Sequence, residues 1–189
     1  TLFENLEPEP YNLALLKRLP FEIRDCKALS LRLAGHWMFS LVSLRLRNDP
    51  EVLRAFVSID NSQMRYASAE LRGNKAFVLS LLADGHSVLK YVSEQLRDDP
   101  EVVKAAVSID DYQMQYASSA RRKDRQLIRE LAKKCKFGYW LAYVDPTVHT
   151  SKWFMFELAL YNDSCALTMG FWIYESSWLF LLAVALMII

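Results

Sequence analysis

The chain is 189 residues long, which is enough to bury a hydrophobic core. Its 23 Lys and Arg nearly balance its 22 Asp and Glu, so no overall basic field favours nucleic-acid binding. Cys26, Cys135 and Cys165 lie far apart and the five glycines are isolated, which excludes a disulfide framework, a Cys-x-x-Cys zinc site and a glycine-rich phosphate loop.

Residues 1–20 are expected to form a leader whose apolar stretch YNLALLKRLP caps the N-terminal end. The sequence then repeats itself. Residues 49–68 and 99–118 are identical at 14 of 20 positions, and a weaker match recurs every 25 residues. We therefore predict four units and a degenerate, basic fifth, at roughly 21–45, 46–70, 71–95, 96–120 and 121–144.

Each unit is predicted to hold two short helices. Asp49-Pro50-Glu51 and Asp99-Pro100-Glu101 are typical helix starts, with Asp as N-cap and Pro at the first helical position. The first helices have one apolar face each, formed by Val52, Leu53, Phe56 and Val57, and by Val102, Val103, Ala106 and Val107. The second helices are expected to use Met64, Ala67 and Leu71, echoed by Leu89, Val92 and Leu96.

Other residues recur in phase with these helices. At one column we expect the first helix to end with a positive φ: Gly35, Asp60, Gly85 and Asp110. The recurring serines are small enough for close helix approach: Ser43, Ser68, Ser93 and Ser118. The recurring tyrosines are expected to be packing rings with the hydroxyl at the rim: Tyr66, Tyr91 and Tyr116.

A two-helix unit cannot bury its apolar stripe alone, whereas stacked units can. We therefore predict an all-α chain in which residues 21–145 form a short α-helical solenoid-like array of about 25-residue two-helix repeats.

The pattern L-R-x-D-x-E-V-V-x-A-A-V, followed by Y-A-S, resembles the tandem repeat family labelled domain of unknown function 4116. Residues 96–107, LRDDPEVVKAAV, carry it best together with Tyr116-Ala117-Ser118, and the resemblance covers roughly residues 21–145. The unit at 71–82 departs from the pattern because it lacks the Asp-Pro start. The family implies no established activity. Its abundance in algal and other protist proteins, and its occurrence in some intracellular bacteria, suggest those settings.

The stretch 121–136 holds eight Lys and Arg against Asp124 and Glu130. Because an apolar helical face continues through it, at Leu127, Ile128, Leu131 and Ala132, we interpret the bases first as a solvated outer face. Attraction to anionic lipid is the second interpretation, and nucleic-acid binding is not expected.

Residues 146–165 are predicted to be an aromatic linker or interfacial segment. The stretch KWFMFELALY at 152–161 is apolar apart from Lys152 and Glu157, which favours a membrane-surface or partner-facing role over simple core packing.

Residues 166–189 are predicted to be a transmembrane or membrane-embedded helix. They hold one charged residue, Glu175, and are long enough to cross a bilayer. Trp172, Tyr174 and Trp178 resemble an interfacial aromatic belt. The alternative is a buried C-terminal core helix.

Glu175 is the one candidate cofactor-binding residue. A carboxylate within a bilayer is protonated, paired or bound to a metal centre, and a carboxylate can coordinate the magnesium of chlorophyll. The cofactor hypothesis is therefore chlorophyll or carotenoid at this segment; the alternative places Glu175 at the interface with only 178–189 in lipid. No catalytic or metal-ligating residues are predicted. His36 and His86 mark equivalent turns beside glycine, and His149 is expected in an exposed loop.

These observations favour a non-catalytic accessory or scaffolding subunit of an organellar membrane complex, photosynthetic or respiratory. Its partners would be other subunits and the lipid bilayer. The resemblance favours a thylakoid over a mitochondrial inner membrane, and the basic stretch places the repeats on the stromal or matrix side. The alternative is a membrane-anchored recognition module, an effector or adaptor whose repeats bind a mobile protein partner. An enzyme is not expected.

Overall fold

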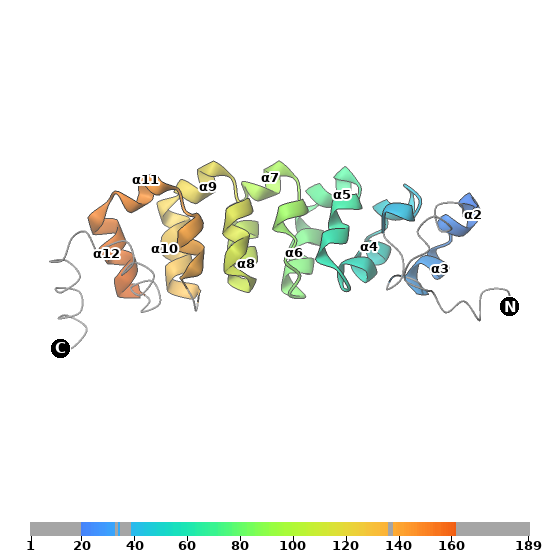
Figure 1. Ribbon diagram of the computed structural model, residues 1–189, viewed down its shortest axis with the longest axis horizontal. Helices are drawn as coiled ribbons and strands as arrows, with labels where there is room; N and C mark the ends of the chain where they lie inside the picture. Colours follow the sequence, from blue (N-terminus) through green and yellow to red (C-terminus); the bar gives the residue numbers. More distant parts are fainter. Residues whose placement is uncertain (1–19, 33, 35–38, 136–137, 162–189) are drawn as a thin grey trace. The chain divides into compact units, whose positions relative to one another are not determined.

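A computed structural model describes residues 20–32, 34, 39–135 and 138–161 (Figure 1). In this part of the chain every regular element is an α-helix or a 3-10 helix and no strand occurs, which confirms the all-α prediction. No helix within the same residues combines the length and hydropathy that crossing a bilayer requires. The leader at 1–19 and the predicted transmembrane segment at 166–189 lie outside the described residues.

The chain divides into two compact units, Thr1–Val92 and Ser93–Ile189. The described helices of the first unit are α2 (Phe21–Arg24), α3 (Lys27–Arg32), η1 (Phe39–Leu41), η2 (Leu46–Asn48), α4 (Pro50–Val57), η3 (Asn61–Tyr66), α5 (Ala69–Gly73), α6 (Lys75–Ala83) and η4 (Leu89–Tyr91). Those of the second unit are α7 (Glu94–Arg97), α8 (Pro100–Ile109), η5 (Asp111–Tyr116), α9 (Ser119–Lys123), α10 (Arg125–Lys134), η6 (Tyr139–Tyr143), α11 (Pro146–His149) and α12 (Lys152–Tyr161).

The predicted helix starts are confirmed. Asp49 Oδ1 accepts the backbone N–H groups of Glu51 and Val52 at 3.0 and 3.2 Å, and Asp99 does the same at the start of α8. Where the Asp-Pro start is missing, Asn74 replaces it by accepting the backbone N–H of Phe77 at the start of α6. The helices therefore begin where a short polar side chain can satisfy their first free N–H groups.

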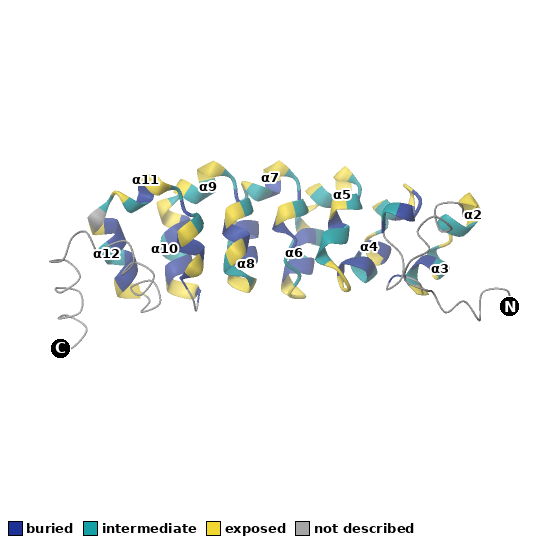
Figure 2. Ribbon diagram, in the orientation of Figure 1, coloured by how far each residue is buried: buried dark blue, intermediate teal, exposed yellow. Residues whose placement is uncertain are grey.

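The predicted apolar faces are buried (Figure 2). All four face residues of α4 and all four of α8 are at most 1% exposed. In the second unit α8 packs against α10, whose four predicted face residues are also buried. These faces form the core of each unit.

The prediction of one continuous second helix is wrong. In the first unit η3 ends at Tyr66 and a separate helix, α5, begins at Ala69, because Ala67 has an extended backbone with φ −61° and ψ 157°. In the second unit the extended backbone of Ala117 separates η5 from α9 in the same way. Met64, Ala67 and Leu71 are buried nevertheless, since the break turns the chain without moving them to the surface.

The expected positive φ occurs at Gly85 but not at the aspartates. Gly85 has φ +90°, and the bonds from His86 N to Leu81 O (3.0 Å) and from Gly85 N to Leu82 O (2.9 Å) close α6 in a Schellman motif. Asp60 and Asp110 both have φ −146°, which corrects the prediction. Their carboxylates cap the next helices, η3 and η5, and an N-cap residue needs an extended backbone.

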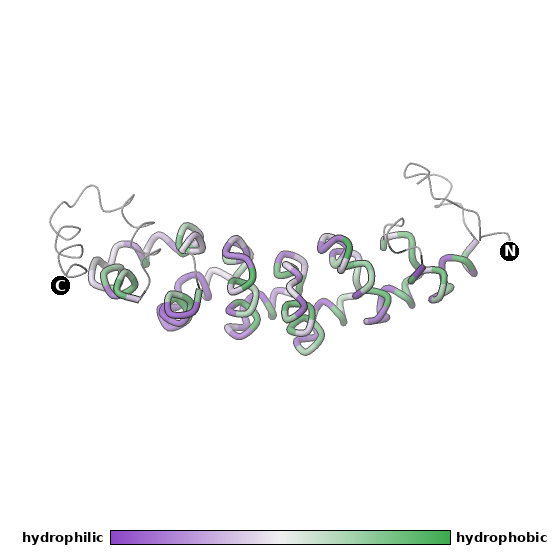
Figure 3. Tube along the Cα trace, turned by 90° about the horizontal axis from the view of Figure 1, so that it is seen from below, coloured by the Kyte–Doolittle hydropathy of each residue, from purple (hydrophilic) through white to green (hydrophobic). Residues whose placement is uncertain are grey.

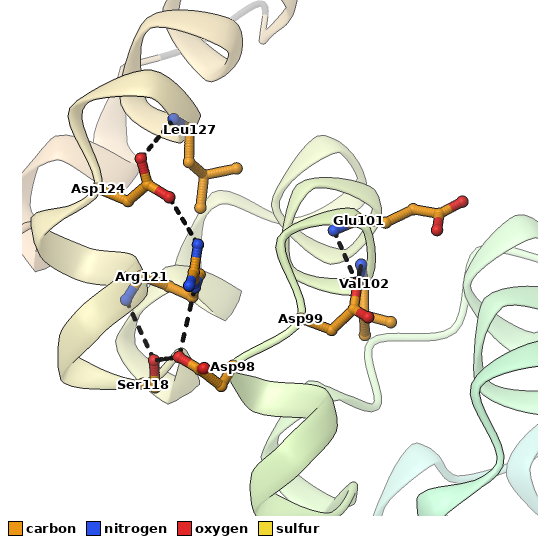
Figure 4. A network of polar contacts seen from close by, with 8 residues as sticks. All are labelled: Asp98, Asp99, Glu101, Val102, Ser118, Arg121, Asp124 and Leu127. Atoms are coloured by element: carbon orange, nitrogen blue, oxygen red, sulfur yellow. Dashed lines mark hydrogen bonds and ion pairs between the residues drawn. The ribbon is translucent and has the colours of Figure 1, made fainter.

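The recurring serines do more than permit close approach. Ser118 N donates to the carbonyl of Arg97 at 2.9 Å, its Oγ accepts the backbone N–H of Arg121 at 3.1 Å, and its hydroxyl donates to Asp98 (Figure 4). Two serines of the first unit make the same three kinds of bond, Ser43 with Arg24, Leu46 and Asp25, and Ser68 with Arg47, Leu71 and Asn48. We call each such set a serine tie.

Replacing Ser118 by alanine is expected to lower the free energy of unfolding of the chain by about 1–2 kcal/mol, because a helix cap is lost. Ser119→Ala is the matched control, since Ser119 is exposed and lies at the first position of α9. Its effect should stay within about 0.5 kcal/mol. Urea unfolding followed by circular dichroism measures both, and equal effects would contradict the role given to the tie.

Candidate functional site

The last described helix of the second unit, α12, is apolar on two sides. Its inner face packs toward α10 and α11 through buried residues, namely Phe154, Met155, Leu158 and Ala159. Its other side carries Trp153, Phe156, Leu160 and Tyr161, which we call the outer row. Trp153 is 83% exposed and Leu160 57%. A helix that is hydrophobic all round is normally covered all round, so the outer row is a candidate contact surface.

The outer row is ordered by its own contacts. The Trp153 ring meets the Phe156 ring edge-on, with centroids 6.5 Å apart. Trp153, Phe156 and Leu160 follow helical spacing, so they share one side of α12. Figure 3 shows how α12 differs in hydropathy from α10: α12 is largely in the green of apolar residues and α10 largely in the purple of polar ones.

Three cations of α10 lie beside α12. Arg125, Arg129 and Lys133 are spaced by four residues and therefore form one stripe, which we call the cationic edge. The guanidinium groups of Arg125 and Arg129 lie 5.1 and 5.0 Å from the centroid of the Phe154 ring. The Lys133 ammonium lies 4.6 Å from that of Tyr161. These cation–π contacts join the edge to both faces of α12.

The acid of α12 is neutralised at the cationic edge. Arg129 donates to both carboxylate oxygens of Glu157, Nε at 2.7 Å and an Nη at 3.1 Å. These bonds hold the pKa of Glu157 below its usual range, and the same carboxylate raises the pKa of Arg129. Arg125, over the ring of Phe154, and Lys133, over that of Tyr161, then remain as net positive charge along α10.

The remainder of the basic stretch does not form a continuous free basic surface. Arg121 pairs with Asp98 at 3.3 Å and with Asp124 at 2.6 Å (Figure 4). Lys123 lies 3.6 Å from Asp145. These bases connect short helices of the second unit to one another. The interpretation of the whole stretch as a solvated face is therefore too simple.

A second cluster surrounds Asp111 at the start of η5. Its Oδ2 accepts the backbone N–H of Tyr139 at 3.1 Å, and the backbone N–H of Trp140 also bonds to its carboxylate. Burial raises the pKa of Asp111 in spite of these bonds. Trp140 is fully buried and Cys135 is buried nearby, where burial first, and the charge of Asp111 second, raise the pKa of its thiol to about 11. This thiol is chemically quiet, and the cluster holds η6 against η5.

The candidate residues from the sequence are not brought together. Glu175, His36 and Cys165 lie outside the described residues. His86 belongs to the turn that closes α6, as expected. His149 is not in an exposed loop, which corrects that prediction; it ends α11 and is half-buried, and burial lowers its pKa. Within the ranges described, no three His, Cys, Asp or Glu side chains are grouped as a metal ion would need.

Residues 74–121 match the family model described as Domain of unknown function (DUF4116). Over this segment the chain is similar to that family, as the sequence resemblance predicts. The matched segment runs from Asn74, the N-cap of α6, to Arg121, which bonds to Ser118. It is shorter than residues 21–145, the range over which the resemblance was expected. No significant match to the chain is found among curated proteins or among solved structures.

The outer row and the cationic edge both lie beyond the residues that match the DUF4116 model. Sequence reasoning found the apolar character of 152–161 but did not separate its two faces, and it did not pair α10 with α12. The spacing of Arg125, Arg129 and Lys133 was the available signal, because residues four apart share one side of a helix.

Asp111→Asn is expected to make the stability of the second unit less dependent on pH. The folded-state pKa of Asp111 is raised above the unfolded value of about 3.9, so its charge destabilises the folded state as pH rises through the folded pKa. The variant keeps an acceptor oxygen without that charge. Its stability relative to the natural chain should therefore be highest at pH 7 and decrease as pH falls below the raised pKa. Urea unfolding at several pH values tests this, with exposed Glu94→Gln as control.

Iodoacetamide at pH 8 should modify Cys26 well before Cys135. Cys26 is exposed, whereas Cys135 is buried and its pKa of about 11 keeps it protonated. Peptide mass mapping over time measures both rates in one sample, and urea should make them similar. Fast modification of Cys135 in the folded chain would contradict its burial beside Asp111.

Proposed function

We propose that the chain is a non-catalytic accessory or scaffolding subunit of an organellar membrane complex, photosynthetic or respiratory. The observation that carries this proposal is the outer row, because Trp153 and Leu160 expose apolar surface on a helix that is already packed on its other side. Exposed aromatic and aliphatic rows of this kind are typical of partner or membrane contacts.

The proposal includes the solenoid-like array of two-helix repeats, of about 25 residues each, over residues 21–145. The serine ties support it, since Ser43, Ser68 and Ser118 are separated from one another by multiples of 25 residues. The backbone N–H of each donates to the carbonyl of an arginine about 20 residues earlier. The Asp49 and Asp99 caps support it in the same way. Stacked repeats offer an extended surface on which other subunits dock.

The membrane part of the proposal concerns residues 166–189. They follow α12 closely in the sequence and hold Glu175 as their only charged residue, which supports a transmembrane or membrane-embedded segment. The thylakoid location, the stromal or matrix side, and chlorophyll or carotenoid at Glu175 stay predictions that rest on the family resemblance and on this segment's composition.

Native gel separation of mild-detergent extracts from the source cells tests the proposal. The full chain, detected by a tag, should comigrate with a large complex whose other subunits are identified by mass spectrometry. A Trp153→Ser/Leu160→Ser variant should reduce this comigration, whereas Leu44→Ser, at an equally exposed apolar residue of the first unit, should not. A chain that migrates alone, or only with a mobile soluble protein, would overturn the proposal and favour the recognition module.

A further inference from the structure

We propose that the outer row of α12 and the cationic edge of α10 together form a binding surface for an anionic lipid bilayer. The inference rests on the proposed membrane location and assigns the lipid contact to α10 and α12, outside the residues that match the DUF4116 model and separate from residues 166–189. The occupant is the headgroup and upper acyl region of a bilayer, with the rings of the outer row inserted and the cations at the headgroups.

The composition of the outer row fits this depth in a bilayer. Three of its four residues are aromatic, and Trp153 and Tyr161 each combine an apolar ring with one polar atom. Such side chains are enriched where hydrocarbon meets headgroup, because the ring and the polar atom are satisfied on opposite sides. Trp153, at 83% exposure, is the residue of the row with most surface to bury.

The charges beside the row favour an anionic surface. The only acid of α12, Glu157, is bound by both Arg129 nitrogens, so it does not repel phosphate groups. Glu130, the acid within the α10 stretch, pairs with Lys104 of α8. Arg125 and Lys133 make cation–π contacts with α12 rings, and within the described residues neither forms an ion pair with an acid. A headgroup phosphate can bond to these cations while they keep their ring contacts.

The geometry also separates lipid from a protein partner. The cations follow α10 and the rings follow α12, which packs against it, so charge and apolar surface lie on neighbouring helices. A helix lying in the bilayer interface needs this arrangement, in which basic residues flank an apolar face. A protein partner would be expected instead to meet an apolar centre with charges at its rim.

The test places one environment-sensitive fluorophore on the full chain. In a Cys26→Ser, Cys135→Ala, Cys165→Ser background, nitrobenzoxadiazole is attached to Leu160→Cys or, as control, to Ile59→Cys. Both positions are aliphatic and 57% exposed, and Ile59 belongs to the first unit. Each protein is studied in detergent-free buffer where soluble, and after reconstitution into neutral phosphatidylcholine vesicles and into vesicles containing phosphatidylserine.

At position 160 we expect blue-shifted emission, quenching by acyl-chain nitroxide and protection from iodide in the anionic vesicles. Position 59 should stay accessible to iodide. In the anionic vesicles, Lys133→Gln should lower the ratio of inserted to free label at position 160 about fivefold, as expected for one base near an anionic surface.

Three outcomes overturn the inference. Equal access of iodide to positions 160 and 59 in the anionic vesicles would show that the outer row does not contact lipid. Equal insertion of the label at position 160 into neutral and anionic vesicles would show that the surface does not prefer anionic lipid. Protection of position 160 without vesicles shows that protein covers the row, either residues 166–189 or a second copy. The vesicle experiment uses the purified chain, so its outcome is independent of the native gel. A negative vesicle result therefore overturns the lipid-binding surface alone, and a negative native-gel result overturns the proposed subunit role alone.

Discussion

The serine tie is the interaction on which both units depend. Their helices are short: α7 has 4 residues, α9 has 5, and the longest among those described have 10. Helices of this length are unstable in isolation, because the cost of nucleation is spread over few hydrogen bonds. A serine that caps one helix and bonds to the carbonyl of an arginine about 20 residues earlier supplies both a start and a fixed position. Burial of the apolar faces then holds the helices together.

These roles explain why the residues that recur most clearly along the sequence are structural. Asp49 and Asp99 satisfy first-turn N–H groups, Asp60 and Asp110 begin the next 3-10 helices, and the serines complete the ties. Their polar atoms are engaged within the fold. The surface left for other molecules is therefore best sought where the columns end, at α10 and α12.

Features governed by local chemistry could be predicted from the sequence, and features governed by distant contacts could not. An aspartate before proline predicts a helix start, and helical spacing predicts the buried faces of α4 and α8. The break at Ala67 accompanies the bond from the backbone N–H of Ser68 to the carbonyl of Arg47, a distant contact that helical spacing does not predict. The two faces of α12 also depend on a distant partner, since α10 determines which side is buried.

The last described helix of the second unit, α12, keeps one apolar side exposed. A capping repeat of a helical array normally turns a polar face to solvent instead. Here Glu157, which could make α12 more polar, is bound by Arg129, and Lys133 lies over the ring of Tyr161. The Arg129–Glu157 pair thus holds α12 to α10 while Trp153 and Leu160 stay exposed. A helix held in this way suits the proposed insertion, because its ion pair with α10 uses neither Trp153 nor Leu160.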